Sequence, residues 1–210
     1  MDKVKNQNPD FILLTGDLID RSTTISTSEL GVLAEGLSKI TTTFAVTGNH
    51  EFDNGHVDEW KRVLTSNGAI VLDNRIKIYE KNNKSIAFIG LKDGQEYNPE
   101  SFKDIYQIKG MPVIMLAHRP ELFETYSSLF NSVNPNLVFA GHAHGGQFRI
   151  PFTNQGIIAP DQGFFPEFTS GIYTRNNVYM IVSRGLGNSI IPIRINNRPH
   201  LPIVELVNQE

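Results

Sequence analysis

Cysteine is absent from the 210-residue sequence. Disulfide bonds and thiolate metal sites are therefore excluded, and any bound metal must take its ligands from histidine, aspartate, glutamate, asparagine or backbone oxygen. Long apolar runs are absent as well, because no segment reaches the roughly 20 consecutive apolar residues that span a bilayer. The first residues, Met1–Lys5, are polar and do not resemble a signal peptide.

A strong charge of one sign is also missing. The formal net charge is -3, so no global basic field exists to attract nucleic acid. This charge does not exclude a small anionic substrate, because a bound cation can dominate the local field. Hydrophobic residues make up 40% and charged residues 20% of the chain, as in ordinary soluble globular proteins. We expect one domain covering residues 1–210.

Short apolar runs predict a series of buried strands. Four of them end in loops that contain glycine or proline: Phe11–Leu14, Thr43–Thr47, Val113–Leu116 and Leu137–Ala140. Further strands are expected at Ala69–Leu72, Ile76–Tyr79 and Ser85–Leu91, with closing antiparallel strands at Val178–Ser183 and Ile203–Val207. Helices are expected at Ser26–Ile40, with Ser26 or Ser28 as the cap, at Val57–Ser66, and from Pro120 to about Phe130. The segment Gln147–Thr174, rich in Gly, Pro and Phe, is expected to be a long ordered loop.

Side chains that can bind metals follow all four of the strands that end in such loops. They are Asp17 with Asp20, Asn49 with His50, His118, and His142 with His144. Because ligands of open α/β sheets collect beyond the carboxyl ends of the strands, these groups can converge although they are distant in sequence. A carboxylate can bridge two cations roughly 3.5–4 Å apart, and imidazoles and an amide oxygen can complete the coordination. Without thiolates, this set suits Mn, Fe, Zn or similar ions.

Each of these groups has an ordinary structural explanation when it stands alone. Asp17 follows a strand, where aspartate usually serves as a turn or cap residue, and a single His118 is more often a partly buried histidine than a ligand. The segment Gly141–Gly146 is the most informative one, because its glycines allow the imidazoles of both histidines to face one point. The prediction of a metal site depends on the ordered combination of the four groups.

Four ordered segments resemble the motifs of calcineurin-like metallophosphoesterases: Gly16–Asp20, Gly48–Glu51, His118 and Gly141–His144. The resemblance covers nearly the whole chain. Gly145–Gln147 and Ser183–Gly187 are similar to a bacterial subgroup related to YkuE and YaeI, which is often membrane-associated and linked to lipid-type phosphodiester substrates. The resemblance implies an α/β fold, a layered α/β/β/α sandwich of the metallo-dependent phosphatase type. It also implies phosphoester hydrolysis, with a phosphodiester as the substrate in this subgroup, by a metal-bound hydroxide at a dinuclear site.

The resemblance assigns metal ligands residue by residue. Asp17 would bridge two divalent ions. Asn49, His118 and His142 would complete the coordination of the second ion, and His144 would bind the first. The ions implied are Mn, Fe or Zn.

The resemblance also implies roles in catalysis and substrate binding. His50 would protonate the leaving oxygen or stabilise charge on the phosphoryl group, and Asp20 would orient His50. Arg21 would contact the substrate phosphate, unless it is an ordinary surface residue. The implied partner is a phosphoester such as a phospholipid or a nucleotide-linked lipid, without specific nucleic-acid binding. The implied location is the cytoplasm or the membrane surface.

The sequence departs from the family pattern at its start. The family begins with an Asp-x-His motif after its first strand, whereas residues 1–15 contain no such motif and have Asp2 and Asp10 as their acids. We therefore expect an N-terminally incomplete domain whose first strand is missing and which has an unpaired strand edge. The first ion would keep only Asp17 and His144 as ligands, so the chain could hold only one of the two ions.

Two other interpretations of the sequence stay open. A catalytically impaired remnant would keep the fold and at most one metal, and it would act as a binding module. Alternatively, four phenylalanines of the long loop would form an apolar surface for lipid or a protein partner: Phe152, Phe164, Phe165 and Phe168. Because aromatic residues serve in cores more often, these side chains are more readily explained as a cover for a sheet edge.

Overall fold

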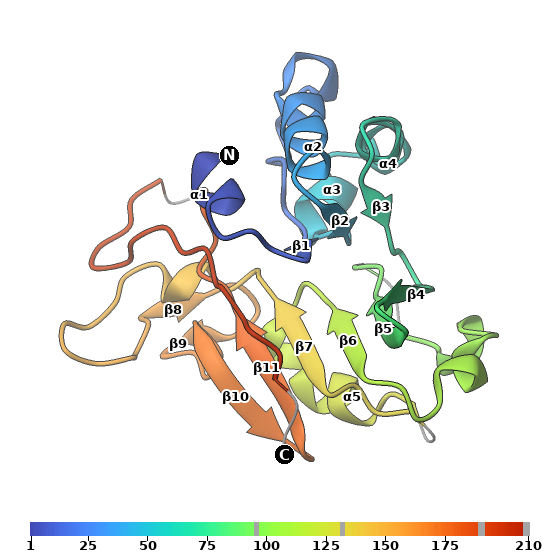
Figure 1. Cartoon of the computed structure of the whole chain (residues 1–210). Coiled ribbons are helices and arrows are strands. Elements are labelled where there is room, and N and C mark those ends of the chain that lie inside the picture. Colours follow the sequence, from blue (N-terminus) through green and yellow to red (C-terminus); the bar gives the residue numbers. More distant parts are fainter. Residues whose placement is uncertain (95–96, 131–132, 189–191, 208–210) are drawn as a thin grey trace.

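Two β-sheets that pack face to face form the centre of the protein (Figure 1). The structure, a computed structural model, describes residues 1–94, 97–130, 133–188 and 192–207. The smaller sheet has the order β1-β2-β3 and consists of β1 (Phe11–Leu14), β2 (Thr42–Ala45) and β3 (Ile70–Val71), all parallel. The larger sheet has the order β10-β11-β7-β6-β5-β4.

The larger sheet is mostly parallel with antiparallel edges. Its strands are β4 (Arg75–Lys81), β5 (Lys84–Gly90), β6 (Val113–Leu116), β7 (Leu137–Ala140), β10 (Gly171–Arg175) and β11 (Val178–Val182). Strands β5, β6, β7 and β11 run parallel, while β4 and β10 pair antiparallel with their neighbours at the two edges. The carboxyl ends of the four parallel strands therefore lie along one rim of the sheet.

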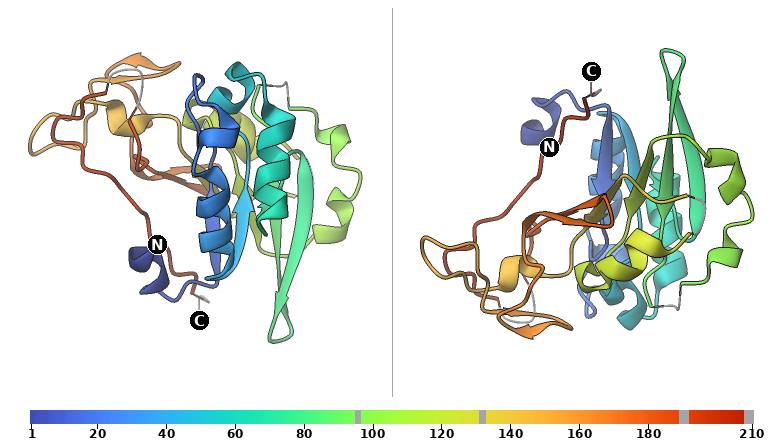
Figure 2. Two further views of the ribbon diagram at one scale, coloured as in Figure 1. Left: turned by 90° about the horizontal axis from the view of Figure 1, so that it is seen from above. Right: turned by 90° about the horizontal axis from the view of Figure 1, so that it is seen from below.

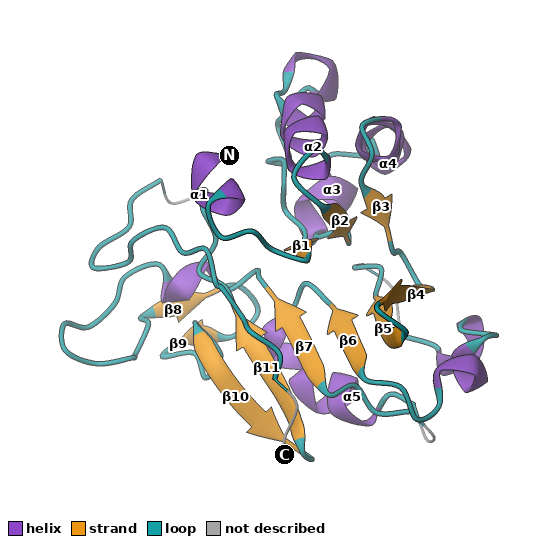
Figure 3. Ribbon diagram, in the orientation of Figure 1, coloured by secondary structure: helices purple, strands orange, loops and turns teal. Residues whose placement is uncertain are grey.

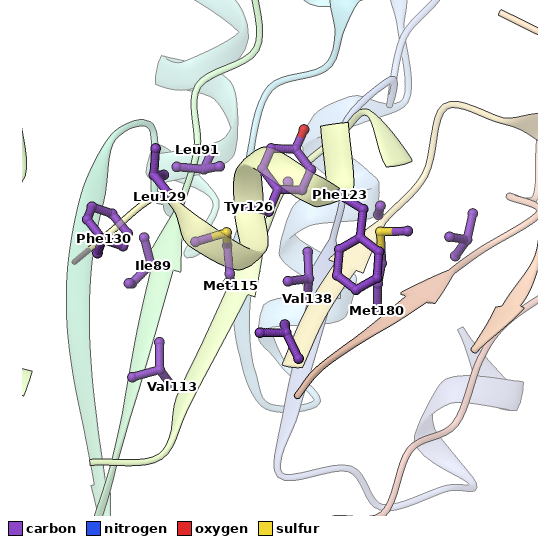
Figure 4. Packing of buried hydrophobic residues seen from close by; sticks show 14 of the residues in the cluster. Ile89, Leu91, Val113, Met115, Phe123, Tyr126, Leu129, Phe130, Val138 and Met180 are labelled. Carbon is purple, nitrogen blue, oxygen red and sulfur yellow. The ribbon is translucent and has the colours of Figure 1, made fainter. Parts of the chain in front are cut away.

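Helices cover the outer faces of both sheets (Figure 2). The helices α2 (Leu30–Ser38) and α4 (Val57–Ser66) pack on the smaller sheet through a cluster that includes the fully buried Trp60 and Leu64. On the other side, α5 (Phe123–Ser128) places Phe123 and Tyr126 against the larger sheet, where they meet Met115, Val138 and Met180 (Figure 4). The predicted α/β/β/α layering is thus confirmed.

The space between the two sheets has its own apolar cluster. The rings of Phe44 from β2 and Phe88 from β5 stack with their centroids 4.4 Å apart, and Leu116 and Leu72 are buried beside them. Because residues on these strands are buried on both faces, their sequences read as continuous apolar runs. The remaining helical elements are α1 (Asp2–Lys5), α3 (Asn49–Asp53) and five 3₁₀ helices: Ile25–Thr27, Pro99–Ser101, Ile105–Ile108, Pro120–Leu122 and His144–Gly146.

Three predicted elements are wrong in part. The helix expected at Ser26–Ile40 begins at Leu30, because the Ser28 hydroxyl donates to the Ile25 carbonyl at 2.7 Å and closes a separate 3₁₀ turn. The expected strand Ile203–Val207 has no strand partner and its apolar side chains are exposed. The helix expected from Pro120 is divided into a 3₁₀ turn and the short α5, so it ends at Ser128.

The segment Gln147–Thr174 contains more regular structure than a loop, although most of it is irregular (Figure 3). It forms the hairpin of β8 (Ile158–Ala159) with β9 (Gly163–Phe164) and most of β10. The four phenylalanines considered above for an apolar surface behave differently. Phe168 is buried against Phe123 and Tyr173, whereas Phe152, Phe164 and Phe165 are exposed. Only Phe168 therefore fits the explanation that these rings cover the sheet.

The strand β1 lies at the edge of the smaller sheet. In the described part of the chain it pairs with β2 alone, so its second edge faces a cavity instead of a strand, as expected for an unpaired edge. The helices of the described residues include none with both the length and the apolar character needed to cross a bilayer.

Candidate active site

The four predicted groups of polar side chains meet at one rim of the two sheets. Asp17 follows β1 and Asn49 follows β2 at the start of α3, so both come from the smaller sheet. His118 follows β6 and His142 follows β7, so both come from the larger sheet. The site therefore lies where the carboxyl ends of strands from both sheets come together, as the sequence predicted.

His118 is at the centre of this group. Its Nε2 atom lies 3.1 Å from Asp17 Oδ2, 3.1 Å from Asn49 Oδ1 and 3.1 Å from His142 Nδ1. The other ring nitrogen, Nδ1, donates to the Thr15 carbonyl at 2.7 Å. This hydrogen bond fixes the ring and leaves Nε2 as the nitrogen that faces the other three groups.

These four atoms are spaced as ligands of one cation would be. Atoms bound at about 2.1 Å to a tetrahedral or octahedral ion lie about 3.0–3.4 Å from their neighbours. Asp17 Oδ2 is buried and accepts no hydrogen bond from the described residues, because its approach to His118 lacks hydrogen-bond geometry. One carboxylate, one amide oxygen and two imidazoles suit a divalent ion such as Mn, Fe or Zn. The residues present therefore fit a metal.

Charge and burial prepare the ligands for a cation. Burial opposes ionisation of Asp17, but the neighbouring His118 outweighs it and holds the pKa of the carboxyl below its usual range. Burial likewise opposes the charge on His118, but Asp17 raises its pKa to about 9. Burial and the adjacent His118 lower the pKa of His142 to about 4. Without a metal, Asp17 and His118 thus form an ion pair beside a neutral His142.

Glu51 holds the two loops of the smaller sheet together, a role that the sequence analysis did not assign. Its side chain is fully buried and its carboxylate accepts from the backbone N–H groups of Asp17 at 2.9 Å, Leu18 at 2.8 Å and Gly48 at 2.6 Å. Glu51 is the third residue of α3, and a Glu that reaches back to the residue before a helix is a recognisable capping signal. That signal predicts the bond to Gly48 but not those to Asp17 and Leu18.

Gly48 allows the close approach of these loops. A Cβ atom at this position would lie 2.3 Å from Asp17 Oδ1 and 2.7 Å from His118 Cε1, so no other residue fits without displacing a candidate ligand. This contact gives a physical reason for a glycine at the start of the Gly48–Glu51 segment.

His50 lies beside the four atoms and approaches Asp20. Its side chain is mostly buried, with Nδ1 3.6 Å from Asp20 Oδ2, and its backbone N–H donates to Asp17 Oδ1 at 3.0 Å. The Ser22 hydroxyl donates to Asp20 Oδ1 at 2.7 Å and steadies that carboxylate. The arrangement agrees with an imidazole oriented by a carboxylate, while the catalytic roles of His50 and Asp20 stay predictions.

The other two predicted residues lie at the periphery. His144 lines the same cavity as Asp17, His50 and His142, and burial lowers its pKa to about 4, but it does not belong to the tight group around His118. Arg21 is exposed, pairs with Asp53 at 3.3 Å and is not among the residues that line this cavity. Their roles as metal ligand and substrate contact stay predictions.

Asp161 is a second residue that sequence reasoning missed. His142 Nε2 donates to Asp161 Oδ2 at 3.0 Å, and Arg119 pairs with the same carboxylate and with Asp93 at 2.8 Å. Glu121 Oε1 is 3.9 Å from the same imidazole nitrogen. Asp161 belongs to the irregular segment between β8 and β9, so no periodicity or motif in the sequence indicates its position.

The site opens into a cavity of about 1300 Å³. This volume exceeds that of typical small-molecule pockets. Its lining includes the free edge of β1, the segments 183–188 and 200–207, and, from the rim, Asp17, Asp20, His50, His142 and His144.

Comparison with known proteins identifies the family. The sequence pattern of calcineurin-like phosphoesterases matches residues 1–146, well over half of the chain. The chain belongs to the calcineurin-like phosphoesterase family. Its predicted enzyme class, a hydrolase acting on phosphoester bonds, is confirmed by this membership.

Relatives of this family support the predicted subgroup. The chain is 27% identical over 207 residues to the uncharacterized metallophosphoesterase YkuE of Bacillus subtilis, covering 97% of this chain and 70% of that protein. It is 28% identical over 206 residues to phosphodiesterase YaeI of Escherichia coli, covering 96% of this chain and 72% of that protein. Among solved structures, NAD nucleotidase of Haemophilus influenzae is similar with a TM-score of 0.51, 16% identity and coverage of 87% and 42% of the two chains. This last likeness concerns the fold alone.

Proposed function

We propose that this calcineurin-like phosphoesterase is a metal-dependent phosphodiesterase with a dinuclear site. The observation that carries the proposal is the position of His118 Nε2, with three further ligand atoms from three other strand ends each 3.1 Å away. Asp17, Asn49, His118 and His142 hold one ion, and Asp17 and His144 contribute to a second. Such ions polarise phosphoryl oxygens and lower the pKa of water, which supplies the nucleophile at neutral pH.

The chain's own residues complete the reaction. His50 lies next to Asp17 and faces the cavity, where its imidazole donates a proton to the leaving oxygen while Asp20 keeps the ring oriented. Arg21, at the edge of this region, contacts the phosphate after leaving Asp53. A diester has organic groups on both sides of phosphorus, and a cavity of about 1300 Å³ is large enough to admit such a substrate.

The substrate we propose is a phosphodiester with an apolar part, such as a phospholipid or a nucleotide-linked lipid. The cavity wall includes Phe139, Ile181, Leu201 and Ile203, which are side chains for which an apolar group has affinity. The relative YaeI of Escherichia coli is named as a phosphodiesterase, which supports the choice of a diester. Action at a membrane surface would follow from such a substrate.

Replacing His50 by alanine tests the proposed chemistry. With bis(p-nitrophenyl) phosphate and added Mn, we expect His50→Ala to lower kcat by about 10²–10⁴-fold, because a general acid contributes that much. Metal content, measured by elemental analysis, should stay unchanged, since the His50 side chain is not one of the four ligands. An equal loss in His56→Gln, an exposed histidine, would contradict a specific role for His50.

The same measurements separate the enzyme from the remnant. A wild-type protein that holds two equivalents of metal and hydrolyses the diester supports the dinuclear enzyme. A wild-type protein that holds one equivalent or none, and is inert at every metal concentration, identifies a catalytically impaired binding module.

A further inference from the structure

Basic side chains without acidic partners gather on the side of the cavity next to His144. Arg184, Arg194 and His200 line the cavity, and Arg149 does not line it but interacts electrostatically with Arg184. In the described part of the chain, none of them lies within 4.0 Å of a carboxylate oxygen, whereas the partly buried Arg119 pairs with both Asp93 and Asp161. A group of cations without counter-charge in a cavity attracts an anion.

The four residues are not equivalent. The guanidinium of Arg149 donates to the carbonyls of Gly145 and Asn154, both at 2.8 Å. Its donors are therefore occupied by the backbone and are not available for a ligand. Arg184 differs, because its guanidinium makes no hydrogen bond and no ion pair with any described residue. Its Nε atom is buried without a partner. An arginine in this state has its donors available for a ligand.

The position of Arg184 is fixed by its neighbours. A Cβ atom at Gly145 would lie 2.7 Å from Arg184 Cγ and 2.9 Å from Cδ, so the methylene chain packs on the residue that follows His144. The guanidinium of Arg194 donates to the carbonyl of Arg184 at 2.8 Å and to the carbonyl of Gly187, so it holds this turn in place and leaves Arg184 as the arginine with free donors. Both arginines line the cavity that contains Asp17, His50 and His144.

The mutual effects of these cations show that their charge is uncompensated. Burial and then Arg184 lower the pKa of Arg194 below its ordinary value. Burial, Arg184 and Arg149 lower the pKa of His200 in the same way. No carboxylate opposes either shift, so the local potential is positive.

We propose that Arg184, held in place by Arg194, binds a second anionic group of the substrate, a phosphate or a carboxylate that is separate from the scissile diester. The subsite deepens the proposed phosphodiesterase function and rests on it. Arginine suits this task because its planar fork donates two parallel hydrogen bonds to phosphate or carboxylate oxygens. The substrate class that follows is a phosphodiester that carries an additional negative charge.

A pair of substrates that differ by one phosphate tests the subsite. Thymidine 5′-(p-nitrophenyl phosphate) has the diester alone, and its 3′-phosphorylated derivative carries the second anion. The wild type should show a kcat/KM about tenfold higher for the 3′-phosphorylated compound, as expected for a charge-assisted contact. In Arg184→Gln and Arg194→Gln this ratio should fall to about 1. Arg198→Gln, an exposed arginine of the same segment that does not line the cavity, should keep the wild-type ratio.

A binding measurement that needs no catalysis completes the test. Calorimetric titration with inorganic pyrophosphate in EDTA should give a Kd about tenfold weaker for both cavity variants than for the wild type and Arg198→Gln. Thermal melting identifies a variant that fails to fold, in which case Arg184→Lys replaces it and should bind more weakly than wild type. Equal affinity in all folded variants overturns the subsite. If pyrophosphate binds as expected but neither thymidine ester is hydrolysed, the proposed phosphodiesterase function is wrong while the anion site stands.

Discussion

Asp161 extends the candidate metal site beyond its direct ligands. It accepts from His142 Nε2 at 3.0 Å, on the side of the ring opposite to the Nδ1 atom that faces His118. A carboxylate in this position fixes the orientation of a metal-binding imidazole and makes the imidazole a more basic, stronger metal ligand. We expect Asp161→Ala to weaken metal affinity about 10–100-fold.

Competition with a fluorescent chelator would measure this affinity directly. Asp104→Asn is the matched control, because Asp104 contacts only Gln107 on the surface in the described part of the chain. An affinity of Asp161→Ala equal to that of the control would show that the carboxylate serves Arg119 alone.

Glu51 gives a second prediction for a single residue. The Glu51 carboxylate accepts hydrogen bonds from three backbone N–H groups. In Glu51→Gln, an NH₂ group replaces one of the two carboxylate oxygens and faces backbone N–H groups that it cannot accept from. Leaving these buried donors unsatisfied should lower the free energy of unfolding by about 2 kcal/mol. Urea unfolding measures the change, with the exposed Glu80→Gln as the control. A difference below about 0.5 kcal/mol, the range of surface substitutions, would contradict the proposed tie between the loops.

The candidate ligands could be predicted from the sequence because each directly follows an apolar strand. Glu51 and Asp161 could not be assigned in the same way. The contacts of Glu51 with Asp17 and Leu18 span more than 30 residues, and Asp161 belongs to an irregular segment. Long-range pairing of this kind depends on tertiary packing, which no local pattern encodes.

At the level of elements, buried strands were the most predictable feature. The runs at Val113–Leu116 and Leu137–Ala140 form strands with the expected bounds. The helix Val57–Ser66, whose apolar side chains lie on one face, also has the expected bounds. The segment Ile203–Val207 has the same apolar content and yet forms no strand, because strand formation requires a partner edge that the sequence alone does not show. Apolar composition thus predicts burial less well near the end of the chain.

The turn that carries His144 depends on a contact between two distant glycines. A Cβ atom at Gly156 would lie 2.6 Å from the Cα of Gly146, which is the last residue of the 3₁₀ helix His144–Gly146. We expect Gly156→Ala to destabilise the protein by about 1–3 kcal/mol, because overpacking forces the two backbones apart. Thermal or urea unfolding measures this cost. Gly187→Ala, where a Cβ meets no atom within 4 Å, should have little effect, and equal losses in both variants would contradict the argument.

For the whole molecule, the important feature is that two sheets share one site. Asp17 and Asn49 belong to the smaller sheet, while His118 and His142 belong to the larger one. The parallel direction of the strands, which the order of strands and helices in the sequence indicates, brings these groups to a common rim. The relative placement of the sheets follows from packing between Phe44 and Phe88, and the sequence contains no local signal for that contact.

The histidines at this shared rim should make the stability of the metal-free protein depend on pH. The folded-state pKa values of His142 and His144 are about 4 instead of the ordinary 6.5, so between these pH values the unfolded chain binds protons that the folded chain excludes. The contribution of these histidines to the free energy of unfolding therefore rises with pH up to about 6.5, and the lowered pKa of His200 acts in the same direction. Burial raises the pKa values of Glu51 and Glu121, and these two carboxyls oppose the rise above pH 4.5. The pKa of His118 is raised from 6.5 to about 9, so above pH 6.5 the folded chain keeps a proton that the unfolded chain releases, and stability falls.

The histidine contribution to the stability of the EDTA-treated protein should thus be greatest near pH 6.5, the ordinary histidine value, and should change by up to about 1.4 kcal/mol per pH unit for each proton. Urea unfolding at a series of pH values from 4.5 to 9, within the range of about 4 to about 9 set by these groups, measures the curve. His118→Gln should remove the decline on the alkaline side, whereas the exposed His56→Gln should leave it in place. Saturating metal should also remove this decline, because a metal-bound His118 carries no proton on Nε2. A metal-free wild type whose stability kept rising from pH 7 to 9 would refute the ion pair between Asp17 and His118.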